Sequence, residues 1–560
     1  MNYPNRFCAA AAVALLLAGQ FAIATTPPKT GKWPAWYWDY MVDGRGVTAT
    51  QSLVPMMRRA QANAQAVQSG ALTAEAALTA GGTAIAGTRT IPLLMVKFRN
   101  TGANPYPETN LQNELFGAFP TGTMTDYYKE ISGGRLTVSG TVRPWVAISR
   151  DDTFYKGQTV TTPNGPETCN ALCRTGKIQE FVTEALAAND AGINFAQFDN
   201  DGPDGIPNSG DDDGVVDFVA LVHPETGGEC GNNSNNIWSH RSALGPAAFT
   251  TNDPRAGGGF IKVNDYVVMP ALACGAAKKM IEIGVFCHEF GHAFGLPDLY
   301  DTDDQNGKSE GVGSWCLMAS GSWGGDGQSP ERPTHMSAWA KQFLGWLTPT
   351  DVKSDLKAAR IASLEDNPVA FKLAISPTQY YLVSYRNKIL FDSKIPSPGL
   401  LVMKINETVL TAGLATNTVN ANANNKGVGV VEADGRNDMD RNVNRGDSGD
   451  VFPGSTNKVA FNNKSKPKSA GKVAVCNIGQ PGTTISADLI TSSGTCKVSV
   501  PKAPDQKTAA RCSSALWLPE GGSGGSGGSG PDLMLLLLPG AAGVFLALRG
   551  SRARGAARAV

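Results

Sequence analysis

Two histidines and a glutamate in the string His288-Glu289-Phe290-Gly291-His292 could bind a metal ion and use it. Residues four positions apart on a helix share one face, so His288 and His292 can present two imidazole nitrogens to one ion. Glu289 then lies beside the open coordination position, where a carboxylate can act as a general base. The spacing predicts a zinc site on a helix, although this short pattern by itself also occurs in ordinary helices.

The residues after this motif can bring a third ligand to the same ion. Gly295 can take the left-handed conformation that ends a helix, and Pro297 prevents the helix from continuing. Asp298 then arrives where the chain doubles back. Two neutral imidazoles and one carboxylate leave a fourth position for water, which is the arrangement expected of a catalytic Zn²⁺.

A second group of possible ligands lies in an acidic stretch between residues 199 and 217. Seven aspartates occur there without a lysine or arginine, and glycines separate them. A flexible, oxygen-rich loop of this kind suits Ca²⁺, although Pro203 interrupts the strict EF-hand pattern. The alternative is a solvated acidic loop that binds no ion. The predicted calcium ligands are Asp199, Asp201, Asp211, Asp213 and Asp217.

The elements that must position these residues mix helices and strands. Patterning predicts strands at residues 91–98, 215–222 and 266–270 and helices at residues 124–131 and 276–294. From about Thr348 onward strands and turns dominate, with strands predicted at residues 380–385, 399–405 and 427–432. The sequence therefore predicts an α+β fold with the metal motif on a helix, followed by a β-rich C-terminal portion.

The composition limits the partners that the protein could have. The chain has 560 residues, and its lysines and arginines equal its aspartates and glutamates at 49 each. A net charge of zero gives no general attraction toward nucleic acid, so we expect no nucleic-acid partner. Its length predicts more than one folded unit.

Several motifs resemble those of one protease family. The zinc motif extended to Asp298 is similar to the signature of metzincin proteases, with Asp where most members have His, and residues 315–321 (WCLMASG) resemble their Met-turn. Residues 296–301 (LPDLYD), 320–323 (SGSW) and 446–454 (GDSGDVFPG) resemble the immune inhibitor A family of secreted metalloproteases, in the branch with an Asp ligand.

That resemblance implies a metzincin-like zinc protease catalytic domain. It implies His288, His292 and Asp298 as zinc ligands, Glu289 as the catalytic base and Met318 as an apolar floor beneath the metal. It also implies a calcium loop in the acidic stretch. Ser384, Lys404 and Asn406 depart from the Glu, His and Asp that are more typical of the family at those positions.

Glu310 is an alternative third ligand. Thermolysin-like enzymes use a glutamate well downstream of the two histidines, and Glu310 follows His292 by eighteen residues. It lies in a loop rich in glycine and serine rather than on an evident second helix, which favours Asp298. His223, His240 and His335 have no ligand-type partner at a suitable spacing, so we expect packing or hydrogen-bonding roles for them.

The two ends of the chain look like targeting segments. An apolar run followed by Ala22-Ile23-Ala24 predicts a signal peptide removed by signal peptidase, and therefore export. A Gly/Ser tract, a short apolar segment and four arginines at the other end resemble Gly-Gly type sorting signals of Gram-negative exported proteins. Such a tail is held in the membrane transiently and then removed by a sorting protease; an ordinary tail anchor is the alternative.

The predicted segments follow from these features. They are a signal peptide (1–24), a prosegment (25–87), a zinc metalloprotease catalytic domain (88–350), a β-rich C-terminal region (351–512), a Gly/Ser linker (513–530) and a hydrophobic sorting segment with an arginine cluster (531–560).

Nine cysteines remain once Cys8 leaves with the signal peptide, so they cannot all pair within the chain. Nearness in sequence suggests disulfides, as expected of an exported protein. The suggested pairs are Cys169–Cys173, Cys230–Cys274, Cys287–Cys316 and Cys476–Cys496.

The function predicted from these observations is that of a secreted zinc-dependent endopeptidase. We expect it to be made as a zymogen, to be secreted or held at the outer cell surface of a Gram-negative-type bacterium, and to hydrolyse peptide bonds in extracellular polypeptides. The alternative is a non-catalytic cell-surface binding protein on the same fold.

Overall fold

A computed structural model describes residues 23–29 and 85–496, except 159, 163, 164, 168, 173–175, 202, 203, 232–234, 276, 277, 304, 305 and 307. Most of the predicted signal peptide and prosegment, the Gly/Ser linker and the sorting segment lie outside the described residues. Within them, no helix has the length and apolar character needed to cross a membrane.

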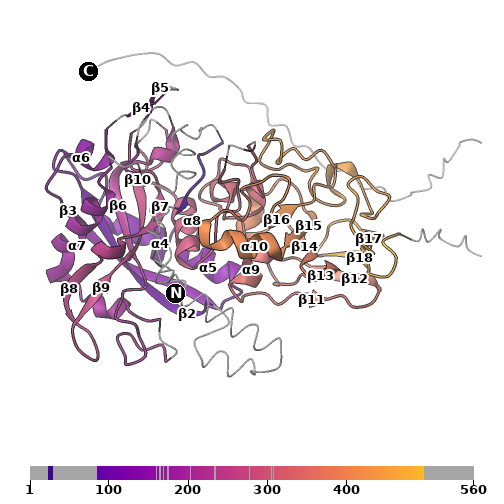
Figure 1. Cartoon of the computed structure of the whole chain (residues 1–560), viewed down its shortest axis with the longest axis horizontal. Coiled ribbons are helices and arrows are strands. Elements are labelled where there is room, and N and C mark those ends of the chain that lie inside the picture. The colour runs from indigo at the N-terminus through magenta and orange to yellow at the C-terminus, as the bar shows by residue number, and fades with distance from the viewer. Residues whose placement is uncertain are drawn as a thin grey trace, which may run out of the picture. The chain divides into compact units, whose positions relative to one another are not determined.

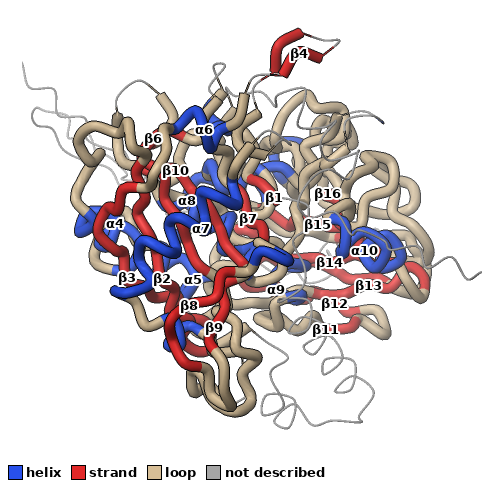
Figure 2. The backbone as a smooth tube through the Cα atoms, turned by 60° about the vertical axis from the view of Figure 1, so that its left-hand side comes forward, coloured by secondary structure: helices blue, strands red, loops and turns tan. Residues whose placement is uncertain are grey.

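A six-stranded sheet forms the frame of the first half (Figures 1 and 2). Its four strands from β10 to β3 are parallel, and β7 and β1 add to one edge in antiparallel pairs. In spatial order the strands are β1 (Ile23–Ala24), β7 (His240–Ala243), β10 (Asp265–Leu272), β6 (Val219–Thr226), β2 (Gly87–Lys97) and β3 (Leu136–Ala147).

Helices cover both faces of this sheet because its strands are apolar on both sides. Along β2, Leu93 and Met95 join one core cluster, whereas Leu94 and Val96 join another. The first cluster includes α4 (Glu108–Phe116), α5 (Met124–Ile131) and α8 (Ile283–Ala293), and the second includes α7 (Ile178–Asn189). Alternate side chains of a strand point to opposite faces, so one strand supplies both cores.

The second half contains two antiparallel-rich sheets (Figure 1). The larger one is β11 (Thr350–Asp351), β13 (Phe371–Ser376), β14 (Gln379–Arg386), β15 (Gly399–Asn406) and β16 (Val428–Val430). The smaller one is β12 (Leu356–Ala362), β18 (Thr484–Ile490) and β17 (Ala474–Cys476). Apolar residues of both sheets share one core cluster.

The larger sheet also belongs to the core around α8. Leu382 of β14 and Leu401 of β15 pack in the same cluster as Phe290 of α8, while their strand neighbours Val383 and Val402 face the smaller sheet. The β-rich half therefore helps to bury the helix that carries the metal motif.

The remaining described elements are short. They are α6 (Asp152–Lys156), β4 (Val160–Thr162), β5 (Gly165–Glu167), β8 (Phe249–Pro254), β9 (Phe260–Val263), α9 (Ala338–Phe343) and α10 (Glu407–Gly413), with several 3₁₀ turns between them.

The predicted mixture of helices and strands is present, and the helix at residues 124–131 is confirmed. The helix predicted for residues 276–294 is shorter: it begins at Ile283, because Met280 pairs with Leu272 as a β-bridge and Glu282 is extended. The strand predicted for residues 215–222 begins at Val219, since Val215 forms only an isolated bridge. The metzincin assignment of the fold stays a prediction.

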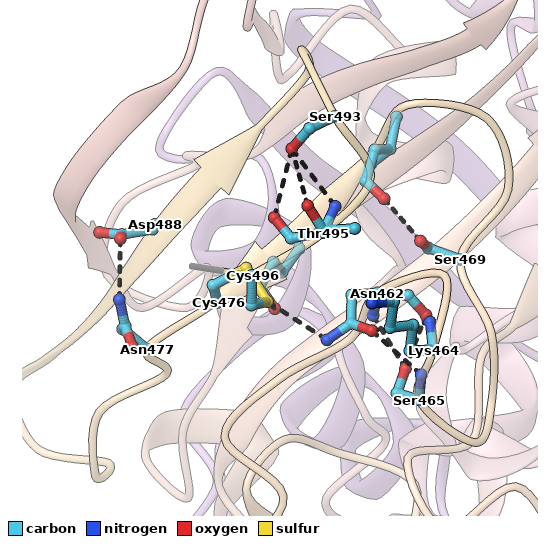
Figure 3. The surroundings of a disulfide bond; sticks show 12 residues. Asn462, Lys464, Ser465, Ser469, Cys476, Asn477, Asp488, Ser493, Thr495 and Cys496 are labelled. Atoms are coloured by element: carbon cyan, nitrogen blue, oxygen red, sulfur yellow. Dashed lines mark hydrogen bonds between the residues drawn. A yellow bond between two sulfur atoms is a disulfide. The ribbon is translucent and has the colours of Figure 1, made fainter. Parts of the chain in front are cut away.

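Two of the suggested disulfides are confirmed, Cys230–Cys274 and Cys476–Cys496, the second at the end of the smaller sheet (Figure 3). Cys169 is disulfide-bonded, and Cys173 lies outside the described residues. The predicted Cys287–Cys316 bridge is wrong, because both are buried free thiols. Cys316 Sγ instead accepts a hydrogen bond from the Ser337 amide at 3.3 Å. Nearness in sequence does not supply the Cβ geometry that a disulfide needs.

Candidate metal centre

Helix α8 carries His288, Glu289 and His292 fully enclosed in the protein, with exposed fractions of 0, 0 and 1%. The glycine between the histidines lets the Met-turn approach closely. A Cβ atom at Gly291 would lie 2.5 Å from Met318 Sδ, so the absent side chain makes room for the methionine. Met318 therefore packs against the helix at Gly291, next to His292 in sequence, and its predicted role as a floor beneath the metal stays a prediction.

The chain reverses directly after α8. Phe294 caps the helix, and Gly295 has a φ of +103°, a conformation that L side chains rarely adopt. The amides of Gly295 and Leu296 bond back to His292 O and Gly291 O. This turn brings Asp298, which is fully buried, to the same side of the helix as the histidines.

The three predicted ligands present their acceptor atoms to one point. His288 Nε2 and His292 Nε2 are 3.0 Å apart, and Asp298 Oδ1 lies 3.3 and 3.2 Å from them. The other ring nitrogens are engaged elsewhere: His288 Nδ1 lies 2.8 Å from Leu317 O and His292 Nδ1 lies 2.8 Å from Leu296 O. If each Nδ1 donates its proton to that carbonyl, each Nε2 keeps a lone pair for a metal.

This donor set fits Zn²⁺. Tetrahedral bonds of about 2.0–2.1 Å place neighbouring ligand atoms about 3.3 Å apart, which matches the spacing of these three atoms. Asp298 Oδ1 is buried and has no hydrogen-bond partner in the part of the chain that the structure describes. A cation between the three side chains would satisfy that oxygen.

The protonation states favour metal binding. Burial lowers the pKa of the His292 imidazole below its ordinary value and outweighs the opposing effect of Asp298, which keeps the ring neutral. Burial opposes ionisation of Asp298, but the neighbouring imidazoles, His292 first, outweigh it and lower its pKa to about 2. A neutral His292 ring and an ionised Asp298 carboxylate are the forms in which these two side chains bind a metal.

Glu289 is next to the ligands and has one occupied oxygen. Oε1 accepts hydrogen bonds from the Thr25 amide at 3.1 Å and from Thr25 Oγ1 at 2.5 Å. Oε2 is buried and has no partner among the described residues. Burial raises the pKa of the Glu289 carboxyl well above its ordinary value, against the hydrogen bonds from Thr25. A carboxyl of this kind can take up and release a proton.

Residues 23–29 run across this site. Ile23 and Ala24 pair with Arg241 and His240 of the edge strand β7. The following carbonyls each accept a side-chain hydrogen bond: Ala24 O from Tyr300 OH, Thr25 O from Trp238 Nε1 at 2.9 Å, Thr26 O from Trp323 Nε1 at 2.8 Å and Pro27 O from Arg445 Nη1 at 2.7 Å. The cleft thus holds an extended peptide by its backbone.

A cavity of about 350 Å³ lies beside this peptide. Its lining includes Lys29 of the segment 23–29, Val285 of α8, and Trp323 and Pro330, which follow the Met-turn in sequence. A side chain of a peptide bound in the cleft could enter a space of this size.

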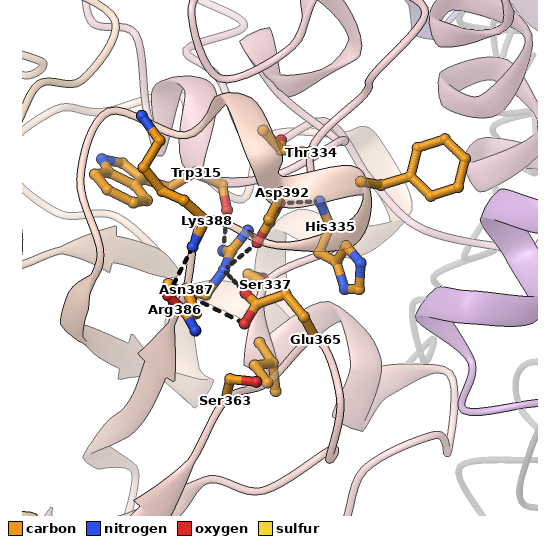
Figure 4. A network of polar contacts seen from close by, with 12 residues as sticks. Trp315, Thr334, His335, Ser337, Ser363, Glu365, Arg386, Asn387, Lys388 and Asp392 are labelled. Carbon is orange, nitrogen blue, oxygen red and sulfur yellow. Dashed lines mark hydrogen bonds and ion pairs between the residues drawn. The ribbon is translucent and has the colours of Figure 1, made fainter. Parts of the chain in front are cut away.

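Residues of the β-rich half form hydrogen bonds with the start of the Met-turn at Trp315 (Figure 4). Arg386 of β14 is fully buried and donates to Trp315 O at 2.8 Å, while its Nε bonds to Glu365 Oε1 at 3.0 Å and Asp392 Oδ2 at 2.8 Å. Trp315 Nε1 donates to Asp450 Oδ2 at 2.8 Å. Asp450 belongs to the stretch 446–454, so that motif supports the metal centre from a distance in sequence.

The other sequence candidates lie away from the three ligands. Glu310 pairs with Arg445 at 3.1 Å, so it does not join the cluster formed by Asp298. His335 lies 2.6 Å from Glu130, and His240 Nδ1 lies 2.7 Å from Trp238 O. Burial lowers the pKa of His223 to about 3, which makes it a neutral core residue.

Of the five predicted calcium ligands, Asp199 and Asp201 belong to the group of three that the acidic loop brings together, and Asp212 is the third member. Carboxylates of Asp199, Asp201 and Asp212 lie within 4.8 Å of one another. Asp211 instead accepts hydrogen bonds from Ser209 Oγ and from the Asp204 amide, Asp213 from the Val215 amide, and Asp217 from the Asn200 amide and Arg89. Asp199 Oδ1 is buried and has no hydrogen-bond partner in the described chain. This trio could hold a cation through oxygen ligands.

Sequence reasoning missed Asn417. Its Nδ2 donates to Asp298 Oδ2 at 2.7 Å, and its Oδ1 accepts from the Asp298 amide at 2.8 Å, across a separation of 119 residues. Asp212 is also absent from the calcium ligands predicted from the sequence. Neither has a motif, although the asparagine-rich stretch from Asn417 to Asn425 is unusual enough to attract attention.

Comparison with known proteins supports the resemblance that the motifs suggest. Residues 104–347 match the family model of the immune inhibitor A peptidase M6 catalytic domain. A pre-pro-metalloprotease PrtV of Vibrio cholerae serotype O1 is 36% identical over 234 residues, which are 40% of this chain and 23% of that protein. Immune inhibitor A of Bacillus thuringiensis subsp. alesti is 34% identical over 238 residues, which are 40% of this chain and 31% of that protein. The matched region thus spans less than a third of each relative.

Proposed function

We propose that the chain is a zinc metalloendopeptidase that is exported and hydrolyses peptide bonds in extracellular polypeptides. The observation that carries this proposal is the convergence of His288, His292 and Asp298 on one point beside Glu289, at 3.0 to 3.3 Å between ligand atoms. The match to a peptidase catalytic domain and to proteins named as metalloprotease supports it.

In this mechanism His288, His292 and Asp298 would hold Zn²⁺. The ion, when bound, supplies Lewis acidity that lowers the pKa of a water molecule and polarises the substrate carbonyl. Glu289 takes the proton from the attacking water and later delivers it to the leaving amine. Its enclosed position beside the ligands excludes bulk water from that transfer.

The described part of the prosegment supports a zymogen. Thr25 donates a hydrogen bond to Oε1 of Glu289, and Trp238 and Trp323 donate to the carbonyl oxygens of Thr25 and Thr26. A substrate would have to displace this segment. If signal peptidase cuts after Ala24, as predicted, the new amino terminus is the Thr25 nitrogen, 3.1 Å from Glu289 Oε1.

We propose Ca²⁺ as a second, structural cofactor at Asp199, Asp201 and Asp212, whose carboxylate oxygens lie within 4.8 Å of one another. The signal peptidase, the sorting protease and the membrane-held tail also remain proposals, and the segments that they concern lie outside the described residues apart from Ile23 and Ala24.

Glu289→Gln tests the catalytic proposal, because it removes the base and leaves the three ligands in place. We expect casein digestion by processed protein to fall by about 10²- to 10⁴-fold, with zinc content unchanged. Glu180→Gln is the control: it is a surface residue of α7 that pairs with Lys177, and we expect full activity. 1,10-phenanthroline should abolish wild-type activity, and the unprocessed precursor should digest casein much more slowly.

Zinc-loaded, processed wild type that digests no polypeptide would overturn the proposal and favour a binding protein on the same fold. Unchanged activity in Glu289→Gln would refute the role of the base.

A further inference from the structure

Asn417 touches the predicted metal ligand Asp298 with both atoms of its side-chain amide. Nδ2 donates to Oδ2 of the carboxylate at 2.7 Å, and Oδ1 accepts from the backbone amide of the same residue at 2.8 Å. Asn417 is 3% exposed and Asp298 is fully buried, so no bulk water competes for these bonds. The asparagine therefore fixes both the backbone and the carboxylate of Asp298.

The two bonds decide which carboxylate oxygen faces the histidines. Asn417 engages Oδ2, and Oδ1 is left 3.3 and 3.2 Å from the Nε2 atoms of His288 and His292. If the Asp298 carboxylate rotated by half a turn, its two oxygens would exchange places. The oxygen then next to Asn417 would still need Nδ2 as its hydrogen-bond donor. A carboxylate that binds zinc through one oxygen is commonly oriented by a hydrogen bond to the other.

The loop that carries Asn417 is itself held against the turn after α8. Asn420 Nδ2 donates to Leu299 O at 2.8 Å, and Thr302 Oγ1 donates to Asn417 O at 2.8 Å. Leu410 and Val419, which flank this loop, pack in the same core cluster as α8. Asn417 thus has a fixed place relative to Asp298.

We propose that Asn417 is a positioning residue for Asp298 and that the β-rich half thereby completes the metal centre. Asn417 lies outside residues 104–347, which match the peptidase family model. The three ligands alone therefore do not make the site: the loop after α10 supplies the group that aims the third one. This inference rests on the proposed zinc function.

A purely local role for Asn417 is the competing explanation. It follows the 3₁₀ turn Leu414–Thr416 and has a φ of 57°, and asparagine is common at such left-handed positions. Asn457 offers a matched control. It follows the 3₁₀ turn Gly454–Thr456 with a φ of 55°, and its side chain is exposed.

The test compares Asn417→Gly, Asn417→Asp and Asn457→Gly in the full processed chain. Glycine takes the left-handed conformation without strain and removes both side-chain bonds. Aspartate keeps the shape and the acceptor but loses the donor to Asp298 Oδ2. Zinc affinity is measured by competition with a chromophoric chelator, and the visible absorption spectrum of the Co²⁺-substituted protein reports on the ligand geometry.

We expect both Asn417 variants to bind zinc about 10- to 100-fold more weakly and to show an altered Co²⁺ spectrum, with Asn457→Gly like wild type. Wild-type zinc affinity and Co²⁺ spectrum in both variants would overturn the inference, whatever their melting temperatures. If Asn417→Gly does not fold, Asn417→Asp decides by the same two measurements. Wild type that holds no zinc would instead overturn the proposed function beneath it.

Discussion

The metal centre and the acidic loop each gather three candidate ligands within 4.8 Å, but the protein prepares them differently. In the centre, each ligand has a further hydrogen bond that sets its direction: His288 to Leu317 O, His292 to Leu296 O and Asp298 to Asn417. The loop carboxylates are hydrogen-bonded too, Asp199 by the Gly214 amide, Asp201 by the Asp213 amide and Asp212 by the Ser209 amide. The trio in the loop, however, consists of carboxylates alone, which repel one another. The centre combines two imidazoles with a single carboxylate, so the two groups differ in the negative charge that an ion would have to offset.

The pKa values of the two aspartates express this difference. The histidine neighbours outweigh burial at Asp298 and lower its pKa to about 2. At Asp199, burial and then the charges of Asp212 and Asp213 raise the pKa to about 7. The Asp298 carboxyl is therefore ionised, as a ligand must be, before any metal binds. Ionisation of Asp199 is unfavourable unless a cation stabilises the charged form.

Removal of the third ligand should give the largest effect. Asp298→Ala leaves two imidazoles, so we expect zinc affinity to fall by more than the about 10- to 100-fold that is typical of losing an outer-shell partner. Glu310→Gln, which disturbs contacts with Arg445 and Ser320 but no predicted ligand, should bind zinc as wild type does. Zinc per mole of dialysed protein, measured by elemental analysis, distinguishes them. The reverse result would assign the third ligand to Glu310.

Calcium removal should have an intermediate effect, confined to stability. At a calcium concentration about 100-fold above the dissociation constant, binding to the native loop alone adds about 2.7 kcal/mol to the free energy of unfolding. We expect this gain to be lost in Asp199→Asn and kept in Asp211→Asn, whose side chain bonds to Ser209 instead. Thermal unfolding with calcium or with EGTA measures it. Equal melting temperatures in calcium and in EGTA for wild type would refute the calcium site.

The metal centre was more predictable from the sequence than the acidic loop. Helical spacing places His288 and His292 on one face, and Gly295 and Pro297 predict the turn to Asp298, because these rules are local. Which aspartates of the loop converge depends on which of them bond to Ser209 and to backbone amides outside the trio, as Asp211 and Asp213 do, and no rule of spacing contains that.

Long-range contacts explain the remaining differences. Asn417 and Arg386 reach the centre from strands and loops that fold onto α8 through a shared core, and no sequence pattern relates them to the motif. The wrong Cys287–Cys316 bridge has the same origin, since nearness along the chain does not bring two sulfur atoms within bonding distance. Strand and helix positions were predictable from periodicity, but boundaries such as Ile283 depended on a bridge between Met280 and Leu272.

The smallest predicted effect is a pH dependence of the calcium-free protein. The pKa of Asp199 is raised from 3.8 to about 7 by burial and by neighbouring aspartates, so in EGTA its contribution to stability is present below pH 3.8 and is lost as the pH rises toward 7. Asp199→Asn removes this titration. In EGTA we therefore expect the variant to melt above wild type by a few degrees at pH 8 and by little at pH 4.5. In saturating calcium the advantage of the variant at pH 8 should shrink, because only wild type gains from the ion. A difference in EGTA that does not change with pH would mean that Asp199 is ionised at no unusual cost, and the contrast with Asp298 would then fail.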